Sequence, residues 1–288
     1  MIHLAARAVQ AAGSSRTGTL VKPLHWTGEN DFLLDGVRFL CGQGNYSLKS
    51  NKDRLVLLKD REILDKYASE FGVEPIKSIV EFGIFQGGSP ALFTLWFELE
   101  KFVGIDVSAP IPEFDEFVMN HERGNRIRTH YGVSQADRSG VERIIRDEFG
   151  TTPIDMIIDD ASHRYSTTRK AFEIGFPWLR PGGSYVIEDW GWAHWAGFDN
   201  YPGETALSKL VMELIMLCAS RNDIVSEVRV FPWFVVVKKS PRAPQLNGMK
   251  LDSLIHRHGI ELVGTKDLNL LGVAKLVMSR LANSIRRR

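Results

Sequence analysis

The sequence contains little that would tie the protein to a membrane, a polyanion or a disulfide framework. Only two of its 288 residues are cysteines, Cys41 and Cys218, too few for a disulfide scaffold or a cysteine-based zinc site. Its 36 lysine and arginine residues balance 35 aspartate and glutamate residues, so no net field attracts a nucleic-acid backbone. No apolar run approaches the ~20 residues that cross a bilayer. We therefore expect a cytoplasmic protein that binds neither nucleic acid nor membrane.

The composition is that of a globular protein, with 44% hydrophobic and 25% charged residues. The length suits one large domain with extensions. We expect an irregular N-terminal extension over residues 1–50, with at most a small hairpin, serving as a lid or for substrate or subunit contacts. A central domain is expected over 51–240, opening with a charged helix over 51–73. A helical C-terminal extension is expected over 241–288.

Short apolar runs alternate with amphipathic stretches from about residue 78 to residue 238. This alternation predicts βαβ units and a parallel sheet. The expected strands are 78–82, 102–106, 126–131, 154–159 and 184–189. The expected helices between them are 90–100, 111–121, 138–149 and 164–179.

Two further apolar runs, 224–230 and 233–238, follow a helix expected over 204–220. Only two residues separate the runs, and this connection is too short for a parallel crossover, so the pair should be antiparallel. The predicted fold is therefore α/β: a Rossmann-like doubly wound sheet of five parallel strands plus a terminal antiparallel pair, with helices on both faces.

A glycine-rich turn follows the first strand of this sheet, with the spacing Gly-x-x-x-Gly-Gly from Gly83. Ligands of open α/β sheets bind at the carboxyl ends of the strands, and glycine lets a backbone approach a ligand closely. Glu81, two residues before the first glycine, would repel a pyrophosphate but suits an ammonium or sulfonium group, as in S-adenosylmethionine (SAM). Asp106 ends the second strand, where a carboxylate can accept hydrogen bonds from ribose hydroxyls. Each feature taken singly is explained equally well by a strand–helix turn or a helix cap.

Carboxylates also gather at the ends of the fourth and fifth strands. Asp160 and His163 follow the fourth strand, and Glu188 and Asp189 end the fifth. Because neighbouring strands lie ~4.8 Å apart, these groups should share one pocket. Three crowded carboxylates cannot all stay ionised without a cation, and Mg²⁺ fits an oxygen ligand set best. Singly, each residue is as well explained by a structural role.

The segments EFGIFQGGSPAL, VGIDVSAP, DDASH and GGSYVIEDW resemble the class I SAM-dependent methyltransferases. More narrowly they resemble the metal-dependent sugar O-methyltransferases of macrolide biosynthesis, of the mycinamicin and macrocin type, and their cephalosporin-methoxylating relatives. The resemblance covers about residues 55–238. It implies that the cofactor is held by Glu81, Gly83, Gly87, Ser89, Asp106, Gln135 and Asp159. It also implies Asp160, Glu188 and Asp189 as metal ligands and His163 as the general base.

The tryptophan-rich segment after the fifth strand is expected to wall the acceptor pocket, because aromatic faces stack well on sugar rings. We assign Trp192 and His194 to this wall; a packed core cluster under the loop is the alternative. The expected function is Mg²⁺-dependent transfer of the SAM methyl group to a hydroxyl of a sugar or glycosylated natural product.

Two alternatives remain open at this stage. A phenol or catechol could be the acceptor of the same metal machinery, although catechol methyltransferases use a lysine base and an Asp-Asn pair where this chain has His163 and Glu188-Asp189. The protein could also be a SAM-binding module without catalysis. The apolar segment 268–281 leads us to expect a homo-oligomer.

Overall fold

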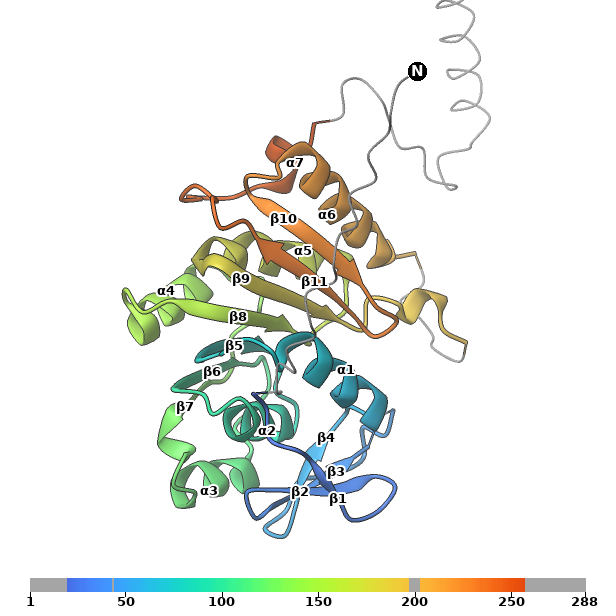
Figure 1. Ribbon diagram of the computed structural model, residues 1–288, viewed down its shortest axis with the longest axis vertical. Helices are drawn as coiled ribbons and strands as arrows, with labels where there is room; N and C mark the ends of the chain where they lie inside the picture. Colours follow the sequence, from blue (N-terminus) through green and yellow to red (C-terminus); the bar gives the residue numbers. More distant parts are fainter. Residues whose placement is uncertain (1–19, 43, 197–202, 257–288) are drawn as a thin grey trace, which may run out of the picture.

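The computed structural model describes residues 20–42, 44–196 and 203–256. These residues form two sheets, a four-stranded sheet near the N-terminus and a seven-stranded sheet that carries the rest of the fold. In Figure 1 the small sheet, in blue, lies at the opposite end of the molecule from the orange strands and helices near residue 250. The mixed α/β fold expected from the sequence is confirmed.

The large sheet has the strand order β10-β11-β9-β8-β5-β6-β7. Neighbouring strands among β5 to β9 pair in parallel, while β11 pairs antiparallel with both β9 and β10. The strands are β5 (Ser78–Phe82), β6 (Lys101–Ile105), β7 (Ile127–His130), β8 (Ile154–Asp159), β9 (Leu179–Glu188), β10 (Val225–Val230) and β11 (Phe234–Lys239). The chain runs outward from β5 through β6 to β7 and then returns to β8 on the other side of β5. This reversal creates a switch point, where ligands of doubly wound sheets bind.

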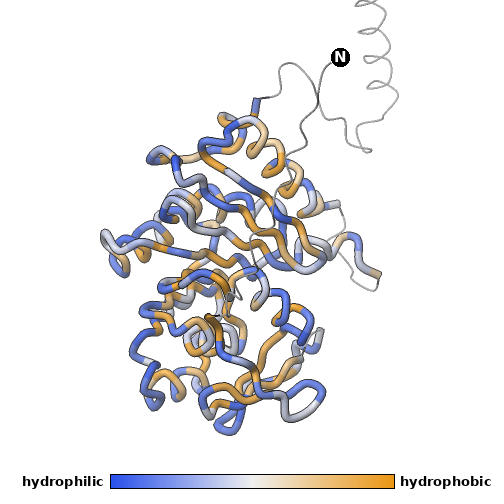
Figure 2. Tube along the Cα trace, viewed as in Figure 1, coloured by the Kyte–Doolittle hydropathy of each residue, from blue (hydrophilic) through white to orange (hydrophobic). Residues whose placement is uncertain are grey.

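Helices cover both faces of the large sheet. They are α1 (Arg61–Phe71), α2 (Gly88–Trp96), α3 (Pro112–Asn120), α4 (Arg138–Phe149), α5 (Tyr165–Gly175), α6 (Ser208–Ser220) and α7 (Leu251–Leu254). Successive residues of a strand point to opposite faces, so Ile79 packs in the core with α1, α2 and α3, and Val80 packs with α4, α5 and α6. Figure 2 shows hydrophobic residues along the central strands and hydrophilic residues at the outer turns. Both faces of the sheet are therefore buried.

The region 1–50 is not irregular where it is described. It contains β1 (His25–Trp26), β2 (Asp31–Leu34) and β3 (Val37–Cys41), and β3 pairs in parallel with β4 (Leu55–Leu57). Phe32 and Phe39 are fully buried in the same core as α1 and α2. The small hairpin named in the sequence analysis is present as β2 and β3. The sequence spacing did not reveal that these strands bury aromatic side chains against the main domain as part of a four-stranded sheet.

The helix expected over 51–73 is also corrected, because α1 begins only at Arg61. Asp60 caps it, accepting a hydrogen bond from the backbone N–H of Ile63 at 2.9 Å. The preceding residues form β4, which is entirely buried. An aspartate at an N-cap fixes a helix start, so the chain reaches residue 59 as extended backbone.

The C-terminal region is described only to residue 256, where α7 is a single short helical turn. The apolar segment 268–281, on which the expected homo-oligomer depends, lies outside the described residues. So does the rest of the helical extension expected over 241–288. Within the described part of the chain, no helix is both long enough and apolar enough to span a membrane.

Candidate active site

A cavity of ≈ 730 Å³ opens at the carboxyl ends of the parallel strands. Its wall is formed by the loops after β5 to β9 and by the segment 44–59 of the N-terminal region. The residues assigned from the sequence that line it are Gly83, Ser89, Asp106, Gln135, Asp160, His163, Glu188, Asp189 and Trp192. Glu81, Gly87, Asp159 and His194 do not line it. Nine of the thirteen assigned residues thus share one cavity.

The two glycines of the turn are required because other parts of the same chain pack closely against them. A Cβ on Gly83, whose φ is +83°, would lie 2.4 Å from the backbone oxygen of Asp160. Gly87, with φ +79°, precedes α2 as its N-cap, and a Cβ there would lie 2.1 Å from Cγ of Phe114. The structure therefore brings Gly83 to the cavity wall, while Gly87 contacts the α3 side of the core instead.

Glu81 lies in the interior of β5 and is 0% exposed. Ser89 Oγ donates a hydrogen bond to its Oε2 at 2.8 Å, and its Oε1 is buried without a partner among the described residues. Burial raises the pKa of this carboxyl well above its usual range. The structure thus places Glu81 behind Ser89, and Glu81 does not line the cavity.

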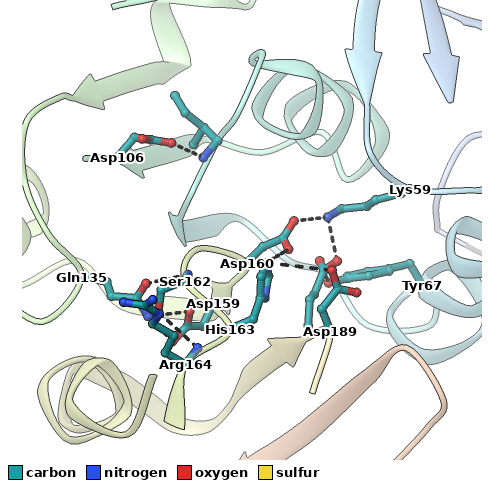
Figure 3. Close-up of polar contacts among 12 residues, drawn as sticks. Lys59, Tyr67, Asp106, Gln135, Asp159, Asp160, Ser162, His163, Arg164 and Asp189 are labelled. Carbon is teal, nitrogen blue, oxygen red and sulfur yellow. Dashed lines mark hydrogen bonds and ion pairs between the residues drawn. The ribbon is translucent and has the colours of Figure 1, made fainter. Parts of the chain in front are cut away.

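Asp106 follows β6 and organises the turn beneath the cavity (Figure 3). The backbone N–H of Ile84 donates to its Oδ2 at 2.8 Å, and Ser108 donates to its Oδ1 from both its backbone N–H and its hydroxyl. Each carboxylate oxygen can accept two hydrogen bonds, so at least one acceptor position of Oδ2 is unused by these bonds. The side chain is both anchored and able to accept from a ligand.

Gln135 and Asp159 bind each other. The side-chain amide of Gln135 donates to both oxygens of Asp159, at 2.9 and 3.1 Å, and accepts from the backbone N–H of Ser162 at 3.0 Å. Asp159 is 2% exposed, and burial raises its pKa to about 8. Of the two, only Gln135 reaches the cavity wall, and Asp159 holds it from behind, so a role of Asp159 toward the cofactor stays a prediction.

The carboxylates and the histidine predicted to act together do meet in the cavity. Asp160 follows β8, and Asp189 follows its neighbour β9. His163 Nε2 lies 4.0 Å from Oδ1 of Asp160 and 3.9 Å from Oδ2 of Asp189. One atom of each of these three residues lies within 4.8 Å of the others, a group with the spacing of metal ligands. Glu188 is not part of this three-residue group.

Lys59 and Tyr67 complete the cluster and were missed by the sequence reasoning. Lys59 Nζ donates to Oδ2 of Asp160 at 2.6 Å and to Oε2 of Glu188 at 2.7 Å, and the hydroxyl of Tyr67 donates to Oε1 of Glu188 at 2.6 Å (Figure 3). Burial lowers the pKa of Lys59, but the carboxylates of Asp160 and Glu188 outweigh it and raise that pKa above its usual range. Lys59 is therefore a buried cation. The signal in the sequence was the apolar run 55–58 just before it, ended by a helix-capping aspartate.

The cluster strongly affects the titration of its own members. Burial first, and then the charges of Asp160 and Glu188, raise the pKa of Asp189 to about 8. Burial lowers the pKa of His163 to about 4. The imidazole is consequently neutral at physiological pH, with one ring nitrogen carrying an unshared electron pair.

The two residues assigned to the acceptor wall are separated by the structure. Trp192 lines the cavity and its ring lies 4.3 Å from that of His163, centroid to centroid. His194 points elsewhere: its Nε2 lies 2.9 Å from the hydroxyl oxygen of Ser208. Trp195, of the same tryptophan-rich segment, lines the cavity with Trp192. The wall expected from the sequence thus includes Trp192 and Trp195, and His194 is excluded because the short 3₁₀ turn Trp192–His194 directs it outward.

Comparison with known proteins agrees with this geometry. Residues 80–190, from β5 to just beyond β9, match the family model described as a methyltransferase domain. The resemblance to class I SAM-dependent methyltransferases is confirmed over this part of the chain.

Two named methyltransferases match part of the chain. The mycinamicin VI 2''-O-methyltransferase of Micromonospora griseorubida is 38% identical over 112 residues, 39% of this chain and 25% of that one. The demethylmacrocin O-methyltransferase of Streptomyces fradiae is 32% identical over 155 residues, 51% of this chain and 36% of that one. The chain thus spans only a quarter to about a third of these relatives. A solved structure of a methyltransferase from the mycinamycin pathway matches with a TM-score of 0.47 and 27% identity, over 62% of this chain and 49% of that one.

Proposed function

We propose that the protein is a SAM-dependent O-methyltransferase that transfers a methyl group to a hydroxyl of a sugar or glycosylated natural product. The observation that carries this proposal is the meeting of Asp160, His163 and Asp189 in the cavity of a methyltransferase domain. The names of the matching relatives support the acceptor class, since they act on macrolide sugars and on a rhamnosyl tetracenomycin. The volume of ≈ 730 Å³ is within the range of small-molecule sites.

The cofactor is proposed to lie across the switch point between β5 and β8. Asp106 would accept hydrogen bonds from the ribose hydroxyls through its unused acceptor positions. Gly83 and Ser89 would contact the methionine part, and Gln135 would form the wall near the adenine. Glu81, Gly87 and Asp159 support these contacts from the second layer, because none of the three lines the cavity.

The donor set suits a hard divalent cation. Two ligands of one Mg²⁺ ion lie about 3–4.2 Å apart, given bonds of about 2.1 Å, and the ligand atoms of Asp160 and Asp189 are within 4.8 Å of each other. We assign Asp160 and Asp189 as ligands, since Mg²⁺ prefers oxygen to the imidazole nitrogen. Glu188, which the resemblance also implies, would bind the ion through the second acceptor position of the oxygen that Tyr67 uses. When bound, Mg²⁺ would polarise the acceptor hydroxyl oxygen.

His163 is the proposed general base. An alkyl hydroxyl is a very weak acid, so its proton must leave as the oxygen takes the methyl group. The neutral imidazole beside Asp160 and Asp189 can accept that proton. Trp192, whose ring packs on that of His163, would limit the motion of the base and present an aromatic face to a sugar ring.

Methyl transfer from SAM should be assayed against a panel of glycosides and catechols, with and without EDTA. We expect turnover on glycosides that EDTA abolishes and added Mg²⁺ restores. Asp189→Asn should be inactive with or without added Mg²⁺. Turnover at full rate after chelation would exclude the metal. Preference for catechols would exclude the sugar acceptor, and tight SAM binding without turnover on any acceptor would indicate a binding module.

A further inference from the structure

Lys59 is the buried cation of the carboxylate cluster, and the proposed chemistry does not use it. It lies between the end of β4 at Leu57 and the helix cap Asp60. Its side chain is 3% exposed. The short connection between β4 and the cap of α1 brings Nζ to the carboxylates of Asp160 and Glu188 from the N-terminal region of the chain. A lysine whose ammonium is simply solvated by water would not have so little of its side chain exposed.

The two oxygens of Asp160 face different partners. Oδ2 accepts from Lys59 Nζ at 2.6 Å, while Oδ1 is the oxygen that lies 4.0 Å from His163 Nε2. Figure 3 shows Lys59 approaching the cluster from one side of Asp160 and His163 from the other. The Lys59 ammonium therefore occupies one side of this carboxylate, and the group of possible metal ligands lies on the opposite side.

Glu188 is held in the same manner. One of its oxygens accepts from Lys59 and the other from the buried hydroxyl of Tyr67. Its side chain is 5% exposed, so without these donors a buried carboxylate would be left unpaired, which is strongly unfavourable. Lys59 thus neutralises part of a cluster of three carboxylates before any metal binds.

We propose that Lys59 is a positioning residue that acts as a built-in second cation of the metal site. Its ammonium confines the divalent ion to the side of Asp160 that faces His163 and Asp189. It also keeps the affinity of the site for that ion low. This inference rests on the metal site of the proposed function. A fixed ammonium one carboxylate away from a divalent ion repels it, and between partly buried charges this repulsion is large. The lysine also lets the domain fold without metal, so that the bound ion can exchange freely.

The test is the affinity for Mn²⁺ alone, measured by isothermal titration calorimetry on the full-length protein. In Lys59→Gln the amide can still donate to both carboxylates but carries no charge. We expect it to bind Mn²⁺ about tenfold or more tightly than the wild type. Lys59→Met should show the same direction. The matched control is Lys49→Gln, which removes a charge from the wall of the same cavity and should change the affinity by less than about threefold, since water screens exposed charges.

Thermal unfolding supplies a second measurement. With EDTA, Lys59→Gln should melt below the wild type, because its carboxylates lose their cation. On adding Mn²⁺ its melting temperature should rise further than that of the wild type, because tighter binding stabilises the folded state more. If a single variant does not fold, the Glu188→Gln protein and the Lys59→Gln/Glu188→Gln protein provide the same comparison, and the latter should bind Mn²⁺ more tightly.

The outcomes separate this inference from the proposed function. Wild-type protein that binds Mn²⁺, with equal or weaker binding in both Lys59 variants, overturns the role of Lys59 and leaves the metal site intact. Binding in the variants but not in the wild type supports the inference in its strongest form. Absence of binding in every protein overturns both the inference and the metal requirement.

Discussion

Two residues of the site have a positive backbone φ angle, which residues other than glycine rarely adopt. His163 has φ +52° and Asp189 has φ +54°. Such conformations cost about 1–2 kcal/mol each and persist only when the surrounding structure fixes them. Asp189 directly follows β9, and His163 lies four residues after the end of the neighbouring parallel strand β8, in the turn that leads into α5. The turn directs the imidazole and the carboxylate toward each other.

Replacing His163 should reduce turnover without affecting the cofactor. His163→Asn is the best variant, because asparagine tolerates a positive φ but cannot accept a proton near neutral pH. We expect kcat to fall by about 10²–10⁴, the usual contribution of a general base, while the SAM affinity stays within about twofold. Steady-state kinetics and calorimetry measure the two quantities. His194→Asn, at a histidine that contacts Ser208 outside the cavity, is the control, and normal turnover in His163→Asn would exclude the proposed base.

Replacing Asp106 should have the opposite profile. The side chain accepts from Ile84 and Ser108, and we expect it to accept from the ribose as well. Asp106→Ala should weaken SAM binding by about 1.5–3 kcal/mol, the range for hydrogen bonds to a charged acceptor. The measurement is calorimetric titration with SAM. Asp147→Ala, at an exposed position on α4, should leave the affinity unchanged; equal affinities in both variants would mean that the ribose is bound elsewhere.

Among the secondary-structure elements, the turn from β5 into α2 depends most on one residue. Gly87 has a positive φ and lies against Phe114 of α3. The sequence suggested that a side chain here would fill space needed by the cofactor. In the structure it would instead collide with an aromatic ring that is 0% exposed. Gly87 allows the start of α2 to lie against Phe114 of α3, so a side chain at this position would disturb the packing of the core.

Gly87→Ala should therefore lower the free energy of unfolding by about 2–4 kcal/mol, from backbone strain together with overpacking. Gly132→Ala is a matched control: Gly132 also has a positive φ, +71°, but a Cβ there meets nothing within 4 Å. It should lose only about 1–2 kcal/mol, the cost of the backbone conformation. Denaturant unfolding measures both, and equal losses would show that Phe114 yields without cost.

At the scale of the whole molecule, the N-terminal sheet is part of the main hydrophobic core and of the cavity wall. Phe32 and Phe39 stack with ring centroids 5.0 Å apart inside the core that also contains α1 and α2. The same region carries Lys59 to Asp160, more than 100 residues later in the sequence. The division into separate regions 1–50 and 51–240 remains a prediction, but the buried contacts favour a single cooperative unit.

Phe39→Ala tests this unity. Removing a fully buried phenylalanine should lower the unfolding free energy by about 3–5 kcal/mol. Because the core is shared, far-ultraviolet circular dichroism and tryptophan fluorescence should report one coincident transition at the lower stability. Val73→Ala, at a position 55% exposed, should change little. Two separate transitions, with only one of them shifted, would show that the N-terminal sheet unfolds independently.

The sequence by itself determined the large sheet and most of the cavity. Strands alternate with helices at spacings that only a parallel sheet satisfies, so the prediction of 78–82 coincides with β5 and that of 138–149 coincides with α4. The strand ends carried the functional residues, because carboxyl ends of parallel strands meet at one edge. Asp160, His163 and Asp189 could therefore be grouped without knowing any coordinates.

Only the tertiary structure decided which side chains turn toward the cavity and which support it. Periodicity assigns a residue to a strand but does not tell whether the side chain of that residue reaches a ligand. Glu81 and Asp159 were assigned to the cofactor on their position at strand ends, and both are buried behind the cavity wall. His194 faces outward for the same reason. Lys59 could not be predicted as part of the site, since its carboxylate partners come from β8 and β9 and the contact depends on how β4 is packed. Local spacing fixes elements, whereas the pairing of charges between distant elements is set by the packing of the whole chain.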